Sequence, residues 1–211
     1  MSGIISQNVG RTSGLVKAAE GGGGTWTLIK TLTASGDSDL SFVDGTSDVV
    51  LDSTYPIYVF KFINMHLSDQ TGGVNFQFNM SADSGSNYNV AKTSTAVYAF
   101  NTEADDDTTL GYGPGSDLAQ GTGFQTLAPT AGSDNADECC SGKLWIFNPS
   151  STTFVKHFIS RSNINNANDT SYNWFYAGYG NTTSAVDAIQ FKFSSGNMDA
   201  GKIKMYGIGD S

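Results

Sequence analysis

The chain has few of the residues on which catalysis and metal binding usually depend. Its 211 residues include two histidines and two cysteines. Neither His66 nor His157 lies in a nucleophile motif such as G-x-S-x-G. Cys139 and Cys140 are adjacent, a spacing that strains a mutual disulfide. We expect two reduced thiols, with pairing between subunits and metal binding as the alternatives. The sequence therefore predicts no catalytic residue and no enzymatic activity.

Positive charge is also scarce. Lys and Arg number 11 against 20 Asp and Glu, which gives a net charge of −9. All but three of the acids are Asp, a turn former, so we expect the acids in loops. Such a surface repels phosphate backbones, and no nucleic-acid partner is predicted.

Long apolar runs are missing as well. No segment approaches the roughly 18 consecutive apolar residues that span a bilayer. The first residues also lack the basic and apolar regions of a secretory signal. We therefore expect a protein that is made in the cytoplasm and has no membrane partner.

The acidic segments raise the question of calcium, because Ca²⁺ prefers several oxygen ligands. Asp105 to Asp107 and residues 133–138 could supply them, although neither segment has the spacing of an EF-hand. The same carboxylates could form a glycosidase pair only if they faced each other across a cleft. The sequence predicts no cofactor, with calcium as the alternative.

What the chain does contain is typical of an all-β protein. Gly numbers 25, aromatics make up 12%, and from Thr25 onward short β-type runs alternate with turn clusters. The longest run, Tyr55 to Leu67, predicts a central strand that is apolar on both faces and needs cover on both. The spacing predicts a jelly-roll-like β-sandwich of about 8–10 antiparallel strands.

Three local expectations follow from the same patterns. Leu40 to Val43 and Thr46 to Leu51 should form a hairpin around an Asp-Gly turn. The stretch 101–141 lacks periodicity and should be a long loop with a functional or interface role. In the strand expected over 153–160, Phe154, Lys156 and Phe158 should share one face, and His157 should be an ordinary strand residue near an interface.

Residues 1–24 differ from the rest of the chain, because single apolar residues are interleaved with Gly and Ser and four consecutive Gly close the stretch. This composition predicts an extended N-terminal arm with a flexible linker, followed by a head domain over 25–211. The alternative is a disordered terminus. The residues expected to anchor the arm to a partner surface are Ile4, Ile5, Val9, Leu15 and Val16.

Aromatic side chains gather in SYNWFYAGYG at 171–180. Alternation places Trp174 and Tyr176 on one face of a strand and Phe175 on the other, so one set fills the core and the other is available to a ligand or subunit. We take Trp174, Tyr176 and Tyr179 as possible ligand-facing aromatics. The alternative is that they fill the core.

The two ends of the chain resemble a known group of proteins. MSGIISQNVGRTSG at 1–14 resembles the opening of many small virion proteins of marine and freshwater tailed bacteriophages. GKIKMYGI at 201–208 is similar to the G-x-I-x-L/M-Y-G-I ending of phage fibre and decoration proteins. Asp83 to Tyr88 is similar to their D-G-S-Y turn, with inserted residues.

This resemblance implies a jelly-roll virion protein, synthesised in the host cytoplasm and commonly a homotrimer. It would serve as capsid decoration or cement, or as a tail fibre or baseplate component. Other virion proteins, such as capsid or tail subunits, would receive the arm. The alternative function is a carbohydrate- or receptor-binding module that recognises host surface glycans.

Overall fold

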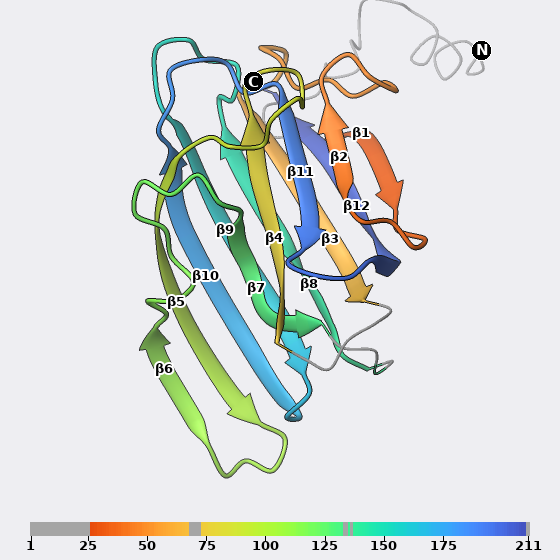
Figure 1. The fold of residues 1–211 in the computed structure, drawn as a ribbon, viewed down its shortest axis with the longest axis vertical. Helices are drawn as coiled ribbons and strands as arrows, with labels where there is room; N and C mark the ends of the chain where they lie inside the picture. Colours follow the sequence, from red (N-terminus) through yellow and green to blue (C-terminus); the bar gives the residue numbers. More distant parts are fainter. Residues whose placement is uncertain (1–25, 68–72, 133–134, 136, 210–211) are drawn as a thin grey trace, which may run out of the picture.

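The computed structural model describes residues 26–67, 73–132, 135 and 137–209. All regular secondary structure in this part is β-strand, and the strands form two antiparallel sheets that pack as a sandwich (Figure 1). The expected all-β, jelly-roll-like sandwich is confirmed. The described residues contain twelve strands, more than the 8–10 expected.

The larger sheet has eight strands, which twist along the length of the molecule. In spatial order they are β1 (Trp26–Thr33), β12 (Met198–Ile208), β3 (Ile57–Leu67), β8 (Cys139–Phe147), β9 (Lys156–Asn166), β10 (Thr170–Gly180), β5 (Lys92–Thr102) and β6 (Thr108–Tyr112).

The smaller sheet has four strands in the order β2 (Leu40–Val43), β11 (Ala188–Phe193), β4 (Val74–Ser81) and β7 (Gln125–Gly132). It covers one face of the larger sheet, which we call the inner face. Figure 1 shows that the lower ends of β5, β6 and β10 extend past the smaller sheet. The opposite face of the larger sheet, the outer face, has no second layer of strands among the described residues.

Phenylalanine rings from both sheets form the centre of the core. The rings of Phe60 and Phe191 lie 5.4 Å apart, and those of Phe78 and Phe158 lie 5.2 Å apart. All four side chains are buried. Since burial of one such side chain is worth roughly 1.5–3 kcal/mol, this cluster is a main source of the sandwich's stability.

The predicted central strand is confirmed as β3, an interior strand of the larger sheet. Its outer face is covered locally, as its apolar character requires. Val59 is fully buried between its cross-strand neighbours Tyr206 and Trp145. The Trp26 ring packs edge-on against both of these rings, at centroid distances of 5.5 and 5.4 Å.

The stretch 101–141, where the sequence predicts a long loop, contains two strands, β6 and β7. The edge strand β6 has five residues, too few to show a clear alternation, and β7 includes Pro129 and pairs with β4 through two register shifts. Bulges of this kind hide the period of two on which strand prediction depends.

Two other expectations were wrong. Thr46 to Leu51 forms no strand: Val49 donates a hydrogen bond to Thr46, and Leu51 donates one to the Asp44 carboxylate, so the segment folds back as a turn. Phe154 does not share the face of Lys156 and Phe158, because β9 begins at Lys156 and leaves Phe154 68% exposed in the preceding turn.

Candidate binding surfaces

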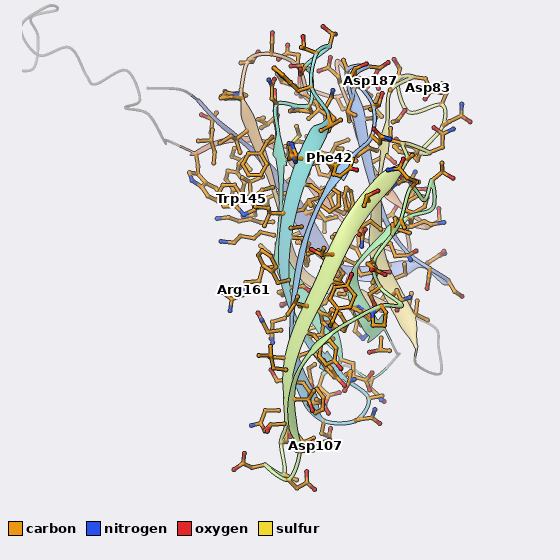
Figure 2. All side chains as sticks on the ribbon, turned by 90° about the vertical axis from the view of Figure 1, so that its left-hand side faces the viewer. Phe42, Asp83, Asp107, Trp145, Arg161 and Asp187 are labelled. Carbon is orange, nitrogen blue, oxygen red and sulfur yellow. The ribbon has the colours of Figure 1, made fainter. Side chains whose placement is uncertain are left out.

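One row of cross-strand neighbours crosses the outer face from edge to edge. Figure 2 shows Trp145 and Arg161 projecting from this face, while Phe42 lies on the opposite side, between the sheets. The row is cationic over four interior strands and apolar over the three strands nearest the β6 edge. In order it consists of Thr31, Lys204, Lys61, Lys143, Arg161, Phe175, Val97 and Tyr112.

The apolar part of the outer face is contiguous across β9, β10, β5 and β6. We call it the apolar strip; its members are Val97, Leu110, Tyr112, Ile159 and Phe175, with exposed fractions from 37% to 78%. A hollow of about 490 Å³ adjoins Ile159. Of the seven large hydrophobic side chains exposed in the described residues, only Phe154 lies off this face. Soluble monomers rarely expose such patches unless they bind something there.

The cationic part consists of Lys61, Lys143, Arg161 and Lys204, which we call the cationic row. The Lys61 ammonium lies 4.3 Å from the centroid of the Trp26 ring, and the Lys143 ammonium lies 5.4 Å from that of Trp145. Both contacts are cation–π interactions, which hold the lysines over aromatic faces. The acids of the larger sheet do not balance these charges, because its eight strands contain a single acid, Asp199.

A second candidate site lies on the inner face, where the free ends of β5 and β10 meet β7. Four aromatic side chains of β5 and β10 gather there, Tyr98, Phe100, Tyr172 and Trp174, and Tyr112 of β6 also lines the space. We call this the aromatic hollow; its volume is about 320 Å³. The Tyr98 and Trp174 rings lie 4.7 Å apart, and those of Phe100 and Tyr172 lie 4.9 Å apart. Trp174 is buried at its floor, and the other three side chains of β5 and β10 are half-buried.

The expected ligand-facing set is not brought together. Trp174 and Tyr176 point inward, with exposed fractions of 7% and 0%, whereas Tyr179 is half-buried on the outer face beside His157. Alternation along β10 was correct, but the exposed member is Phe175. A ligand could therefore reach Trp174 only through the aromatic hollow, and Tyr176 belongs to the core. Sequence reasoning missed Tyr98 and Phe100 as neighbours, because β5 and β10 are joined only in the folded sheet.

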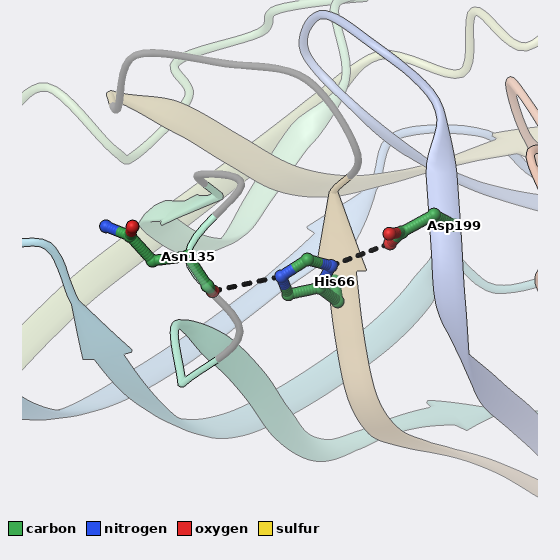
Figure 3. A network of polar contacts seen from close by, with 3 residues as sticks. All are labelled: His66, Asn135 and Asp199. Atoms are coloured by element: carbon green, nitrogen blue, oxygen red, sulfur yellow. Dashed lines mark hydrogen bonds and ion pairs between the residues drawn. The ribbon is translucent and has the colours of Figure 1, made fainter.

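His66 links β3 to two other segments (Figure 3). Its Nδ1 lies 2.7 Å from Asp199 Oδ1, and its Nε2 lies 3.0 Å from the Asn135 carbonyl oxygen. Both partners accept hydrogen bonds, so both ring nitrogens must donate, as they do in the imidazolium form. Burial, the largest single influence, opposes the charge, but the bonds to Asp199 and Asn135 and the charges of Asp199 and Glu138 together raise the pKa of His66.

Lys92 is fully buried between the sheets. Its ammonium donates to the Asn79 side-chain oxygen and, over 2.7 Å, to the Val90 carbonyl oxygen. Asn79 in turn donates to the carbonyl oxygens of Tyr88 and Thr122, so the network ties β4 and β5 to two loops. Burial lowers the pKa of Lys92 to about 7. The interior therefore disfavours the charged form of this residue.

Cys139 and Cys140 are both free, the first half-buried and the second buried. Burial raises the pKa of both thiols, and raises that of Cys140 the more strongly. Since the thiolate is the reactive species, both thiols are poor nucleophiles here.

In the acidic segment at the β5–β6 turn, the Asp106 carboxylate accepts a hydrogen bond from the Thr102 hydroxyl. The described residues contain no group of three or more His, Cys, Asp or Glu side chains placed to hold a metal ion.

The residues expected to anchor the arm, from Ile4 to Val16, lie outside the described residues. No helix in the described residues is long and apolar enough to cross a membrane.

Comparison with protein-family models, curated proteins and solved structures finds no match to this chain.

Proposed function

We propose that the chain is a non-enzymatic structural component of a tailed-phage virion. In this proposal, a trimeric jelly-roll head is fixed to capsid or tail subunits by residues 1–24 and displayed on the particle, as capsid decoration or as part of a tail fibre or baseplate. The resemblance of the two ends and the sandwich fold both favour this reading. The observation that carries it furthest is the apolar strip, an exposed surface suited to contacts between copies.

The position of the strip fits this role. Its members lie on four neighbouring strands, and Phe175, Val97 and Tyr112 stand side by side in one row. In a trimer, three such strips can face one threefold axis, where each strip contacts those of both neighbours. Contact there would remove from water several apolar side chains that the smaller sheet does not reach.

The test of the virion role is quantitative mass spectrometry of purified particles, against the major capsid protein. Deletion of residues 1–24 should leave a folded oligomer that no longer joins the particle. Hundreds of copies of the intact chain would indicate decoration, and a few tens would indicate a fibre, neck or baseplate. Absence from particles, or normal incorporation of the shortened chain, would contradict the proposal.

The aromatic hollow favours a second candidate function, recognition of host surface glycans. Sugar rings stack on aromatic faces, and five aromatic residues line the hollow, whose volume is about 320 Å³. Trp174→Ala should then weaken binding to a host-derived glycan array, whereas Tyr176→Phe, which changes only a buried core residue, should not. If no glycan bound, or if both variants bound equally, this second candidate would fail.

A further inference from the structure

The cationic row places four positive side chains directly opposite one another. Lys204 pairs with Lys61, Lys61 with Lys143, and Lys143 with Arg161, on the adjacent strands β12, β3, β8 and β9. Neighbouring strands lie about 4.8 Å apart, so the row spans about 14 Å. Like charges directly opposite in a sheet are destabilising.

Within the described residues, no carboxylate relieves this repulsion. The only acid in the eight strands, Asp199, is hydrogen-bonded to His66. The cations are held instead by neutral groups: Lys61 and Lys143 lie over aromatic rings, and Arg161 Nε donates to Asn173 Oδ1 over 2.7 Å. The chain has an excess of acids, yet it places them elsewhere. A single Asp in the row would remove the free-energy cost of this like-charge repulsion, but the sequence places none there. We take this as a sign that a ligand supplies the negative charge.

The groups around the row indicate what that ligand is. A hollow of about 550 Å³ contains Lys61, Lys143 and Arg161 on one side. On its other side lie the cross-strand neighbours Ser141, Asn163 and Asn173. Amide side chains suit sugar hydroxyls, and the cations suit sulfate or carboxylate groups. The Asn163 amide nitrogen donates to Ser171 and Tyr172, which leaves Asn163 Oδ1 to accept, and Asn173 uses its Oδ1 for Arg161, which leaves its amide nitrogen to donate. The Ser141 hydroxyl is already bonded to Asn64. Because Asn173 holds only Nε of Arg161, the two terminal nitrogens of the guanidinium remain for a forked contact with an oxyanion.

We propose that the cationic row and the adjoining hollow bind an acidic polysaccharide. Sulfate or carboxylate groups lie along Lys204, Lys61, Lys143 and Arg161, and hydroxyls contact Asn163 and Asn173. An acidic peptide fits less well, because the row lies on interior strands whose backbone is already paired and offers no free edge for strand addition. This site is separate from the aromatic hollow and adjoins the apolar strip, where Arg161 lies opposite Phe175, and it does not depend on the virion role.

The test measures binding of the full chain to immobilised dextran sulfate, alginate, neutral dextran and polyglutamate by biolayer interferometry at several salt concentrations. We expect dextran sulfate, alginate or both to bind, more weakly as salt rises, and neutral dextran not to bind. The Lys61→Gln/Lys143→Gln double variant should lose about tenfold or more in affinity. The matched control is Lys192→Gln, which removes a cation from the smaller sheet, where Lys192 lies over Phe124, and should bind like the wild type.

Thermal unfolding of the variants separates a loss of binding from a loss of folding. Because the double variant removes like-charge repulsion and, with it, the cation–π contacts of Lys61 and Lys143, its midpoint of thermal unfolding without ligand should stay close to that of the wild type. Arg161→Lys, which keeps the charge but removes the fork, should bind more weakly than the wild type while it stays folded. The proposal is overturned if neither charged polysaccharide binds, if Lys192→Gln loses as much affinity as the double variant, or if polyglutamate binds as tightly as the better polysaccharide.

Discussion

Lys92 makes the stability of the protein depend on pH in a way that can be calculated. Its pKa is lowered from 10.5 to about 7 by burial. Between these values the unfolded chain binds one proton that the folded chain does not, so the free energy of unfolding rises with pH across this window. The slope is at most about 1.4 kcal/mol per pH unit, which amounts to about 3 kcal/mol between pH 7 and pH 9.5. Below pH 7 both states hold the proton and the contribution is constant.

Replacement of Lys92 by Met removes this dependence. We expect the stability of the wild type, relative to Lys92→Met, to increase by about 3 kcal/mol between pH 7 and pH 9.5, measured by urea unfolding at each pH. The control is Lys202→Met, which removes the same charge from an exposed position on β12. A difference that stays constant with pH would refute the reasoning, as would an equal pH-dependent difference in the control.

Three further variants test other parts of the structure. His66→Gln should lower the free energy of unfolding by on the order of 1 kcal/mol at pH 5.5 and by less at pH 8.5. The pKa of His66 is raised in the folded protein, so the stabilisation is complete at low pH and is lost as pH rises through that folded-state pKa. Equal losses at both pH values would contradict this. Gly142→Ala should destabilise the fold by roughly 2 kcal/mol or more, since a Cβ there would lie 2.4 Å from the backbone oxygen of Arg161, whereas Gly123→Ala meets nothing within 4 Å and should change the melting temperature little. Tyr176→Phe should change stability by less than about 1 kcal/mol, because among the described residues the buried hydroxyl makes no well-aligned hydrogen bond and interacts only weakly with Ser116. A loss of several kcal/mol would show that the hydroxyl has a strong partner.

The sequence predicts those features that depend on local patterns. Alternation identified β4 and the central strand β3 and placed Tyr98 and Phe100 on the inner face of β5. It failed at β7, where bulges and a proline break the period, and at Thr46 to Leu51, where hydrogen bonds from Val49 and Leu51 form a turn instead of a strand.

The candidate sites could not be read from the sequence, because each depends on strand register. Lys61, Lys143 and Lys204 are far apart in the chain and become neighbours only when β12, β3 and β8 pair. For the same reason Lys92 looks like an ordinary polar residue, although its burial depends on Asn79 and on a loop carbonyl oxygen. Along β10, alternation defines two faces, but only the position of the smaller sheet decides that Phe175 is the exposed residue.

The most direct test of the central claim is the mass of the full-length protein in solution, measured by analytical ultracentrifugation. The account predicts a trimer for the wild type. Phe175→Asp, which places a charge in the apolar strip, should shift the protein to the monomer while it remains folded. Phe154→Asp makes the same substitution at an exposed phenylalanine away from the outer face and should remain trimeric. A monomeric wild type, or a Phe175→Asp variant that still assembles, would contradict the claim that copies meet through the apolar strip.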